Sequence, residues 1–333
     1  MKKFLFSFLL MLSTSIWTGG NITKLNQVDI WWNEFGNRND PTVLMIMGLN
    51  SNSQVWSDAY IEGLVNEGFH VVIFDNRDIG KSEWLTQEPG FISFIKSLPE
   101  WFIEYFVDFT LSFMFDETGR FNMANPAPAE YDLNDMAKDG IAILDHVGKQ
   151  KAHIVGASLG GMISQVMTLN YPDRVQSLTI LMSTPGFDTP GLSGPTESFK
   201  LAIKKSFLLN LLGREEEALW VTERALTGSR YPFDSNQFQL ESKKRLEHGI
   251  NTANAQMMAV GASPNRADRL KYISQPTLII HGREDPLIPI DHGEFLSKNI
   301  PESRTLFLDG VGHEIPDQSL SEIIPAMVQN FSR

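Results

Sequence analysis

Ser158 is the residue of this chain whose surroundings most clearly predict covalent chemistry. It lies between Gly156 and Gly160 in the stretch "IVGASLGG", after an apolar run and before a segment with helical spacing. A serine on such a strand–turn–helix elbow projects its hydroxyl above the sheet, where it can attack a carbonyl carbon. The N-terminus of the following helix directs N–H groups at developing negative charge, so the Leu159 N–H is a candidate oxyanion donor. The structural alternative is a glycine-rich turn with an idle serine.

A serine nucleophile needs a histidine base, and a carboxylate must hold that histidine. In proteins that carry their nucleophile on such a strand–turn–helix elbow, the acid and then the histidine follow the serine along the chain. Asp285 comes just after the apolar run "LIIHG", and His313 follows the run "LFLDG". Their order and loop positions predict a catalytic triad with Ser158. Glu284 and Asp188 are rival acids, and each predicted residue could also have a purely local role.

A second oxyanion donor is expected from the loop after the apolar run at 42–48. We predict the N–H of Leu49, with Gly48 giving the backbone room and Asn50 offering a side-chain donor. A plain glycine turn is the alternative reading, because a backbone donor leaves little mark on a sequence.

The elements that would position these residues alternate between apolar runs and helical patterns. The pattern predicts strands at 28–36, 42–48, 70–76, 152–158, 175–183, 276–282 and 304–310. It predicts helices at 53–68, 131–148, 159–172 and near 319–333. Continuous apolar strands separated by helices are typical of a mostly parallel, doubly wound α/β sheet with both faces covered.

Two long segments interrupt this alternation, and structureless loops of such length are uncommon in a compact domain. We therefore predict a core formed by 21–186 and 273–333, with an inserted 84–130 segment and a helical cap at 187–272. The 84–130 segment is rich in aromatic residues. These are Phe91, Phe94, Trp101, Phe102, Tyr105, Phe106, Phe109, Phe113 and Phe115. Three readings stay open for them: packing on the cap, an apolar substrate pocket, or a surface that docks on lipid.

The composition excludes some classes of function. The chain has 333 residues, 42% of them hydrophobic, and a formal net charge of −12. This charge, with Lys and Arg scattered, argues against nucleic acid as a partner. The chain has no cysteine, which removes disulfides, thiolate metal sites, a cysteine nucleophile and a lipoprotein anchor. No cluster of ligands for a metal or cofactor is evident, so none is expected.

The N-terminus has the layout of an export signal. A basic "MKK" precedes an uncharged apolar run at 4–17, and small residues follow up to Gly20. This pattern is typical of a secretory signal peptide, and the run is shorter than the roughly 20 residues of a spanning helix. Residues 1–20 are therefore expected to direct the protein to the periplasm or the medium. An uncleaved membrane anchor and a helix packed on the domain are the alternatives.

Taken together, these motifs resemble the α/β-hydrolase superfamily. The matching pieces are "MGLNSNSQVW", "FDNRDIGKS", "VGASLGGMISQ", "HGREDPLIP" and "GVGHEIP". They look most like the branch of bacterial esterases that contains aclacinomycin methylesterase. The resemblance implies Ser158, Asp285 and His313 as the triad, and Asp75 and Arg77 as structural residues that hold the turn before the 84–130 segment. The chain departs from many members at Met47, where they have histidine, and in the length of the 84–130 segment.

The expected function is hydrolysis of a small apolar carboxylic ester through an acyl-enzyme. Ser158 argues against the haloalkane dehalogenases and epoxide hydrolases of this fold, which use an aspartate nucleophile. Carbon–carbon bond hydrolases, acyltransferases and perhydrolases keep the same triad and stay open, as does a ligand receptor with slow turnover, because the fold alone does not determine the reaction. The sequence leaves the oligomeric state open.

Overall fold

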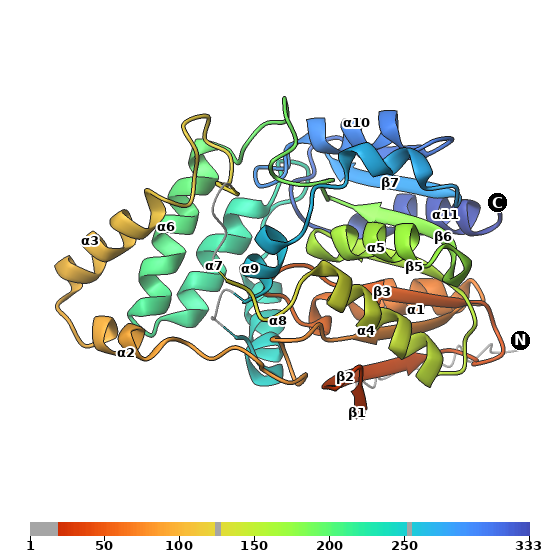
Figure 1. The fold of residues 1–333 in the computed structure, drawn as a ribbon, viewed down its shortest axis with the longest axis horizontal. Helices are drawn as coiled ribbons and strands as arrows, with labels where there is room; N and C mark the ends of the chain where they lie inside the picture. Colours follow the sequence, from red (N-terminus) through yellow and green to blue (C-terminus); the bar gives the residue numbers. More distant parts are fainter. Residues whose placement is uncertain (1–18, 124–127, 252–254) are drawn as a thin grey trace, which may run out of the picture.

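The structure is a computed structural model that describes residues 19–123, 128–251 and 255–333. The apolar run at 4–17, with its predicted signal or anchor role, lies outside the described residues. Eight strands form one sheet (Figure 1). They are β1 (Asn21–Leu25), β2 (Val28–Phe35), β3 (Thr42–Ile46), β4 (His70–Phe74), β5 (Ala152–Ala157), β6 (Val175–Leu181), β7 (Thr277–Gly282) and β8 (Arg304–Leu308).

The α-helices of the described residues are α1 (Asp58–Asn66), α2 (Gly90–Lys96), α3 (Glu100–Leu111), α4 (Leu133–His146), α5 (Leu159–Asn170), α6 (Glu197–Leu211), α7 (Glu215–Leu226), α8 (Ser235–His248), α9 (Ala255–Ala262), α10 (Ile290–Asn299) and α11 (Leu320–Phe331). Short 3₁₀ helices occupy Ser53–Val55, Pro172–Arg174, Ala267–Tyr272 and Asp317–Ser319. The helix predicted over 53–68 is therefore divided. Its α-helical part starts after Ser57, whose side chain accepts the N–H of Tyr60 as an N-cap.

The strand order is β1-β2-β4-β3-β5-β6-β7-β8, and the six strands from β4 to β8 in this order run parallel. Only β1 and β2 pair in antiparallel fashion with their neighbours. The predicted mostly parallel, doubly wound α/β-hydrolase fold is confirmed. The edge strand β1 was not predicted, because its sequence "NITKL" is short and its side chains are mostly exposed.

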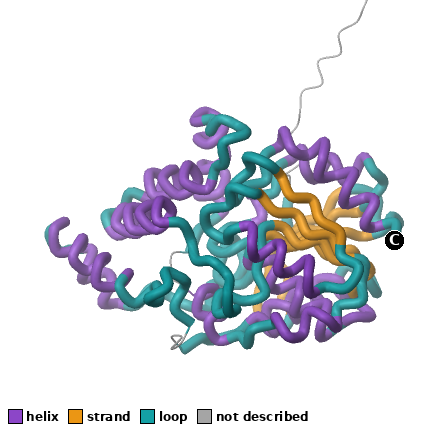
Figure 2. The backbone as a smooth tube through the Cα atoms, turned by 90° about the horizontal axis from the view of Figure 1, so that it is seen from above, coloured by secondary structure: helices purple, strands orange, loops and turns teal. Residues whose placement is uncertain are grey.

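The core has two layers, one on each face of the sheet (Figure 2). One layer joins the sheet to α4, α5 and α10, and the other joins it to α1 and α11. Strands β3, β4, β5 and β7 are buried along their whole length, as their continuous apolar sequences require. The parallel strands therefore bring their carboxyl ends to one edge of the sheet, where the loops that carry Ser158, Asp285 and His313 begin.

Helices α2, α3 and α6–α9 lie beside this edge rather than on a face of the sheet (Figure 1). Helices α2 and α3 pack on α6 through a small cluster that includes Ile95, Ile103, Val107 and Leu211. No helix in the described ranges has the length and hydropathy needed to cross a bilayer.

Candidate active site

Ser158 occupies a strained turn between β5 and α5. Its backbone angles are φ 54° and ψ −117°, a conformation that side chains other than glycine adopt only when their surroundings enforce it. The surroundings do so on both sides of the residue. The Ser158 N–H donates to the Leu181 carbonyl at 2.9 Å, and the Ser183 hydroxyl donates to the Ser158 carbonyl at 2.7 Å.

The two flanking glycines are required by close backbone contacts. A Cβ on Gly156 would lie 2.2 Å from the carbonyl oxygen of Gly160, and a Cβ on Gly160 would lie 2.0 Å from that of Ile46. Strand β5, helix α5 and the end of β3 therefore meet without room for a methyl group. This packing is the physical reason for the G-x-S-x-G pattern, and it gives the turn the geometry of a nucleophile elbow.

Asp285 and His313 are in direct contact. The His313 Nδ1 lies 2.6 Å from the Asp285 Oδ2, and the other carboxylate oxygen accepts the N–H groups of Leu287 and Ile288 at 2.9 and 2.8 Å. Burial alone would raise the pKa of Asp285. The charge of His313 and the hydrogen bonds from His281 and His313 outweigh burial and hold that pKa well below its usual range. Asp285 is therefore an ionised acceptor that fixes the imidazole through Nδ1.

The rival acids are engaged elsewhere. The exposed Glu284 accepts both the N–H and the hydroxyl of Ser229 at 2.8 Å, and Asp188 accepts the side-chain amide of Asn265 at 2.6 Å. His281 is a buried neighbour of Asp285. Its Nε2 is 2.7 Å from the Ile288 carbonyl and 3.4 Å from the Asp285 Oδ2, so its main partner is the carbonyl and the carboxylate is a longer second contact.

Ser158 and His313 follow the carboxyl ends of β5 and β8, at the same edge of the sheet. Within the described residues, the Ser158 hydroxyl makes no hydrogen bond, to His313 or to any other group. Contacts between a nucleophile and its base are often long in enzymes without substrate and shorten when substrate binds. The structure thus brings the predicted acid and base into contact, and it places the predicted nucleophile at the same edge of the sheet.

The loop after β3 passes close to the serine. A Cβ on Gly48 would lie 3.1 Å from the Ser158 Cβ and 3.6 Å from its hydroxyl oxygen, so Gly48 gives the room that the sequence suggested. The Asn76 side chain donates to the Met47 carbonyl at 3.0 Å and holds it in place. In the described part of the chain, the N–H of Leu49 and that of Leu159 have no hydrogen-bond partner, so both are available as donors.

Side chains from the 187–272 segment hold this loop from the other side. Gln256 of α9 accepts the Asn50 N–H at 2.9 Å and donates to the Arg77 carbonyl at 2.9 Å. The buried His248 of α8 lies 2.7 Å from the Asp75 Oδ2, and the other oxygen of that carboxylate accepts the N–H of Ser53. Sequence reasoning did not find Gln256 or His248, since no local pattern marks a partner about 200 positions away.

The same segment also contacts the histidine loop. The Leu226 carbonyl, at the end of α7, accepts the His313 N–H at 2.9 Å. The Glu314 carboxylate accepts the Gly228 N–H at 2.8 Å, and burial raises the pKa of this carboxyl. The loop after β3 and the His313 loop are therefore both connected to the 187–272 segment by hydrogen bonds.

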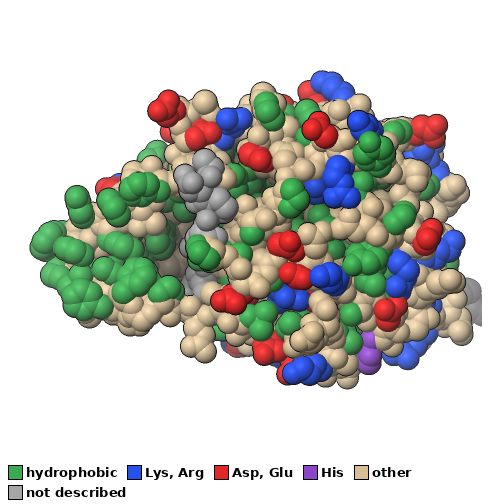
Figure 3. Space-filling view, in the orientation of Figure 1, with side chains coloured by type: hydrophobic (Ala, Val, Ile, Leu, Met, Phe, Trp, Pro, Cys, Tyr) green, Lys and Arg blue, Asp and Glu red, His purple; other side chains and the backbone are tan. Residues whose placement is uncertain are grey.

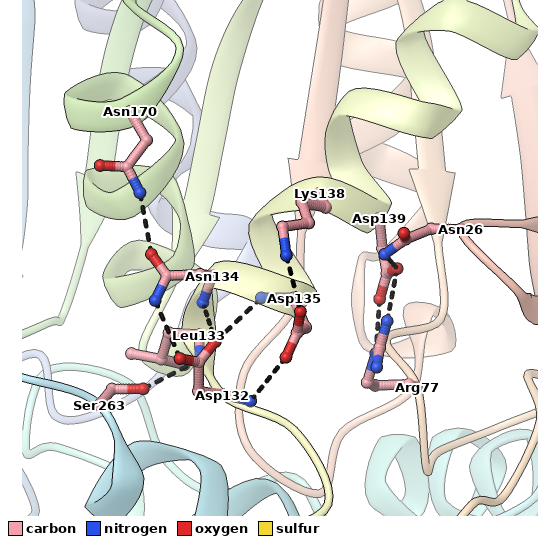
Figure 4. A network of polar contacts seen from close by, with 10 residues as sticks. All are labelled: Asn26, Arg77, Asp132, Leu133, Asn134, Asp135, Lys138, Asp139, Asn170 and Ser263. Atoms are coloured by element: carbon pink, nitrogen blue, oxygen red, sulfur yellow. Dashed lines mark hydrogen bonds and ion pairs between the residues drawn. The ribbon is translucent and has the colours of Figure 1, made fainter.

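Arg77 and Asp75 have the structural roles that the resemblance implied. The Arg77 guanidinium forms two 2.7 Å hydrogen bonds with the buried Asp139 of α4, which also accepts the Asn26 side chain (Figure 4). Asp75 accepts the Lys81 N–H at 2.9 Å and so holds the turn before the 84–130 segment.

Comparison with known proteins agrees with this geometry. The family described as "alpha/beta hydrolase fold" matches residues 41–319. The chain is 27% identical to the rhodomycin D methylesterase DauP of Streptomyces sp. (strain C5), covering 89% of this chain and 92% of that protein. It is 24% identical to a 2-hydroxy-6-oxononadienedioate/2-hydroxy-6-oxononatrienedioate hydrolase of Paraburkholderia phymatum, covering 82% of this chain and 80% of that one.

A solved structure shows the same fold. The esterase EaEST from Exiguobacterium antarcticum superposes with a TM-score of 0.69 at 17% identity, over 95% of this chain and all of that one. The described residues hold no cluster of three or more His, Asp or Glu side chains that could bind a metal ion. The predicted resemblance to bacterial esterases is confirmed, and the chain belongs to the α/β-hydrolase family.

Proposed function

We propose that this protein is a serine hydrolase that cleaves a carboxylic ester through an acyl-enzyme. The observation that carries the proposal is the 2.6 Å contact between His313 and an ionised, buried Asp285, at the sheet edge where Ser158 stands on a strained elbow. This arrangement supplies a base whose tautomer Asp285 fixes and a serine hydroxyl at the same edge of the sheet, and the proposal requires that substrate binding bring the two into hydrogen-bonding range.

In the proposed mechanism, the Ser158 Oγ attacks the ester carbonyl carbon while the His313 Nε2 takes the hydroxyl proton. The N–H groups of Leu49 and Leu159 bind the oxyanion that forms. The carbonyl re-forms, the bond to the alkoxy oxygen breaks, and His313 returns the proton to the leaving alcohol. A water molecule then gives its proton to His313 and attacks the acyl carbon, which releases the acid and restores Ser158. Asp285 stays ionised throughout.

The similarity to a protein named as a methylesterase supports an ester as substrate and an alcohol as leaving group. We further propose that the 187–272 segment is a cap over the site, because its residues contact both the Leu49 loop and the His313 loop. With its aromatic neighbour at 84–130, this cap would select small apolar esters.

The proposal is tested with purified protein and a panel of p-nitrophenyl esters and methyl esters of apolar acids. We expect turnover by the wild-type chain and a loss of several orders of magnitude in kcat for Ser158→Ala. Glu284→Gln is the matched control, since Glu284 contacts Ser229 and not His313. Full turnover by Ser158→Ala would refute the mechanism.

Carbon–carbon bond hydrolysis on the same triad is the second candidate, because one similar protein is named as a dienedioate hydrolase. That reaction predicts turnover of a vinylogous 1,5-diketone acid and little turnover of simple esters. Labelling of Ser158 without turnover of any ester would instead favour a receptor or an acyltransferase. Turnover only with an added alcohol or with peroxide would favour an acyltransferase or a perhydrolase, respectively.

A further inference from the structure

Helices α2 and α3 and the turn after α3 present a set of aromatic side chains to solvent. We call this set the aromatic face, and each member is between 56% and 69% exposed. It consists of Phe91, Phe94, Trp101, Tyr105, Phe109 and Phe113. In the space-filling view, hydrophobic side chains cover the end of the molecule formed by these helices (Figure 3).

The aromatic face is not the packing face of the helices. On α3, Trp101, Tyr105 and Phe109 recur every four residues and lie on one side. Ile103 and Val107, on another side, are buried and form the cluster that joins α3 to α6. In the described residues, α3 therefore packs on α6 through Ile103 and Val107, and the aromatic row stays exposed to solvent.

The size of the face indicates an interaction. Aromatic side chains of this kind each bring about 150–250 Å² of surface, so six of them at this exposure present roughly 700 Å². The largest apolar patch on a typical monomer covers about 300–600 Å². A stable complex of two proteins buries about 800 Å² on each partner. An area of roughly 700 Å² lies within the range of about 600–1,000 Å² per partner, so area alone does not separate a second copy from other occupants. A second copy would carry the same net charge of −12, and this charge opposes association of two copies.

The chemistry of the face fits a lipid surface better than a second copy. Tryptophan and tyrosine are the residues that gather at the boundary between headgroups and acyl chains, and phenylalanine inserts below them. Lys96 is the one basic residue of α2 and α3, and it is paired with Glu88 at 2.8 Å. Glu100, Glu104 and Asp108 lie on α3 beside the aromatic row, and Lys204 of α6 forms an ion pair with Asp108. Because Lys96 and Lys204 are both paired with carboxylates and Glu100 and Glu104 remain, the border offers no surplus positive charge to anionic lipids, and a bilayer with zwitterionic headgroups is the complementary surface.

We propose that the aromatic face docks this protein on the surface of a zwitterionic phospholipid bilayer, with Trp101 and Phe109 at the level of the upper acyl chains. Docking does not depend on the reaction at Ser158, so it can fail or succeed independently of the proposed esterase function. If both hold, apolar esters dissolved in the bilayer are the accessible substrates.

The test is performed with the full chain and vesicles of phosphatidylcholine that carries bromine on its acyl chains. Bromine quenches the fluorescence of a tryptophan only at close range. The Trp101 signal is obtained as the difference between the wild type and Trp101→Phe, and Trp84→Phe serves as the control because Trp84 is exposed outside the aromatic face. The apolar run at 4–17 is present in every sample, so this local signal separates docking of the face from any other attachment.

We expect the Trp101 difference signal to be quenched by the brominated lipid and the corresponding Trp84 difference signal to stay unquenched, whatever Trp17 of the apolar run contributes to the total. The double variant Phe94→Ser, Phe109→Ser should weaken the vesicle-dependent quenching of Trp101 by roughly tenfold in lipid concentration, since binding scales with buried apolar area. The matched control is Leu240→Ser, Tyr272→Ser, which removes two side chains of similar exposure, 70% and 69%, on other elements. Circular dichroism and thermal melting verify that each variant is folded.

Two results would overturn the proposal. One is quenching that is absent in the wild type or unchanged in Trp101→Phe. The other is a dimer in sedimentation velocity that Phe94→Ser, Phe109→Ser dissociates, which would assign the aromatic face to a second copy of the chain.

Discussion

Replacing Gly160 with alanine should force apart the end of β3 and the start of α5. The added Cβ would lie 2.0 Å from the Ile46 carbonyl oxygen and 2.6 Å from its carbonyl carbon. A non-bonded carbon–oxygen contact needs roughly 3.3 Å, so the two backbones must separate by about 1 Å or more. No flexible side chain can absorb this shift, because both partners are backbone atoms of packed elements.

The shift has two measurable consequences. Overpacking of this kind costs about 1–3 kcal/mol, which a chain of this size registers as a fall in Tm of several degrees. The displacement also separates Ser158 from the Leu49 loop, and a misplacement of about 1 Å costs roughly a hundredfold in rate. We therefore expect kcat/KM for a p-nitrophenyl ester to fall by about two orders of magnitude while the protein remains folded at 25 °C.

Gly90→Ala is the matched control. Gly90 is the first residue of α2, and a Cβ added there would meet no atom within 4 Å, so alanine should be neutral or stabilising by up to about 1 kcal/mol. Differential scanning calorimetry and steady-state kinetics on both variants decide the matter. If Gly160→Ala keeps the wild-type Tm and kcat/KM, the close approach of β3 and α5 is wrong and the nucleophile elbow loses its structural basis.

The remaining predictions concern three residues: Asp285, His153 and Gln256. Asp285→Asn should lower kcat about ten-thousandfold, because the amide favours the wrong imidazole tautomer, while Glu284→Gln leaves kcat unchanged in the same assay. Burial lowers the pKa of His153 to about 4, so between about pH 6.5 and 4 this histidine is protonated in the unfolded chain and neutral in the folded chain. His153 should accordingly cost up to roughly 3 kcal/mol of stability as the pH drops from about 6.5 to 4. Urea unfolding should show a smaller loss in His153→Gln than in His146→Gln, and the loss that remains comes from His70 and His292, whose pKa burial also lowers. Gln256→Ala removes the acceptor of the Asn50 N–H, so kcat/KM should fall roughly tenfold in steady-state kinetics. The Tm of the variant is measured beside that of the wild type to separate this effect from a loss of stability.

The parts of the site that could be predicted from the sequence are those with a local signature. The elbow at Ser158 is encoded within eight residues, because the glycines, the buried strand and the helix start are adjacent in the chain. The positions of Asp285 and His313 follow from the order of buried strands, whose carboxyl ends must share an edge in a parallel sheet. The contact between these two residues is seen in the structure, whereas the approach of His313 to Ser158 stays a prediction.

The parts that escaped prediction depend on distant pairs or on which side of a helix is buried. Gln256 and Asn50 are 206 positions apart, and either side chain alone looks like an ordinary polar residue. The aromatic 84–130 segment showed helical spacing, but spacing cannot tell a covered face from an exposed one. The structure buries Ile103 and Val107 and exposes Trp101 and Tyr105, so packing accounts for only part of that segment. The edge strand β1 has no apolar alternation that would mark it.

Activation of Ser158 by His313, which Asp285 holds in place, is the step on which the proposed reaction depends. The rate and site of reaction with a fluorophosphonate, followed by intact mass and peptide mapping, report on this step alone. We predict one adduct per chain on Ser158, formed at least about a thousandfold more slowly in His313→Ala. An adduct on a different serine, such as Ser51 or Ser183, or equal labelling rates in the two proteins, would show that these residues do not have the proposed roles.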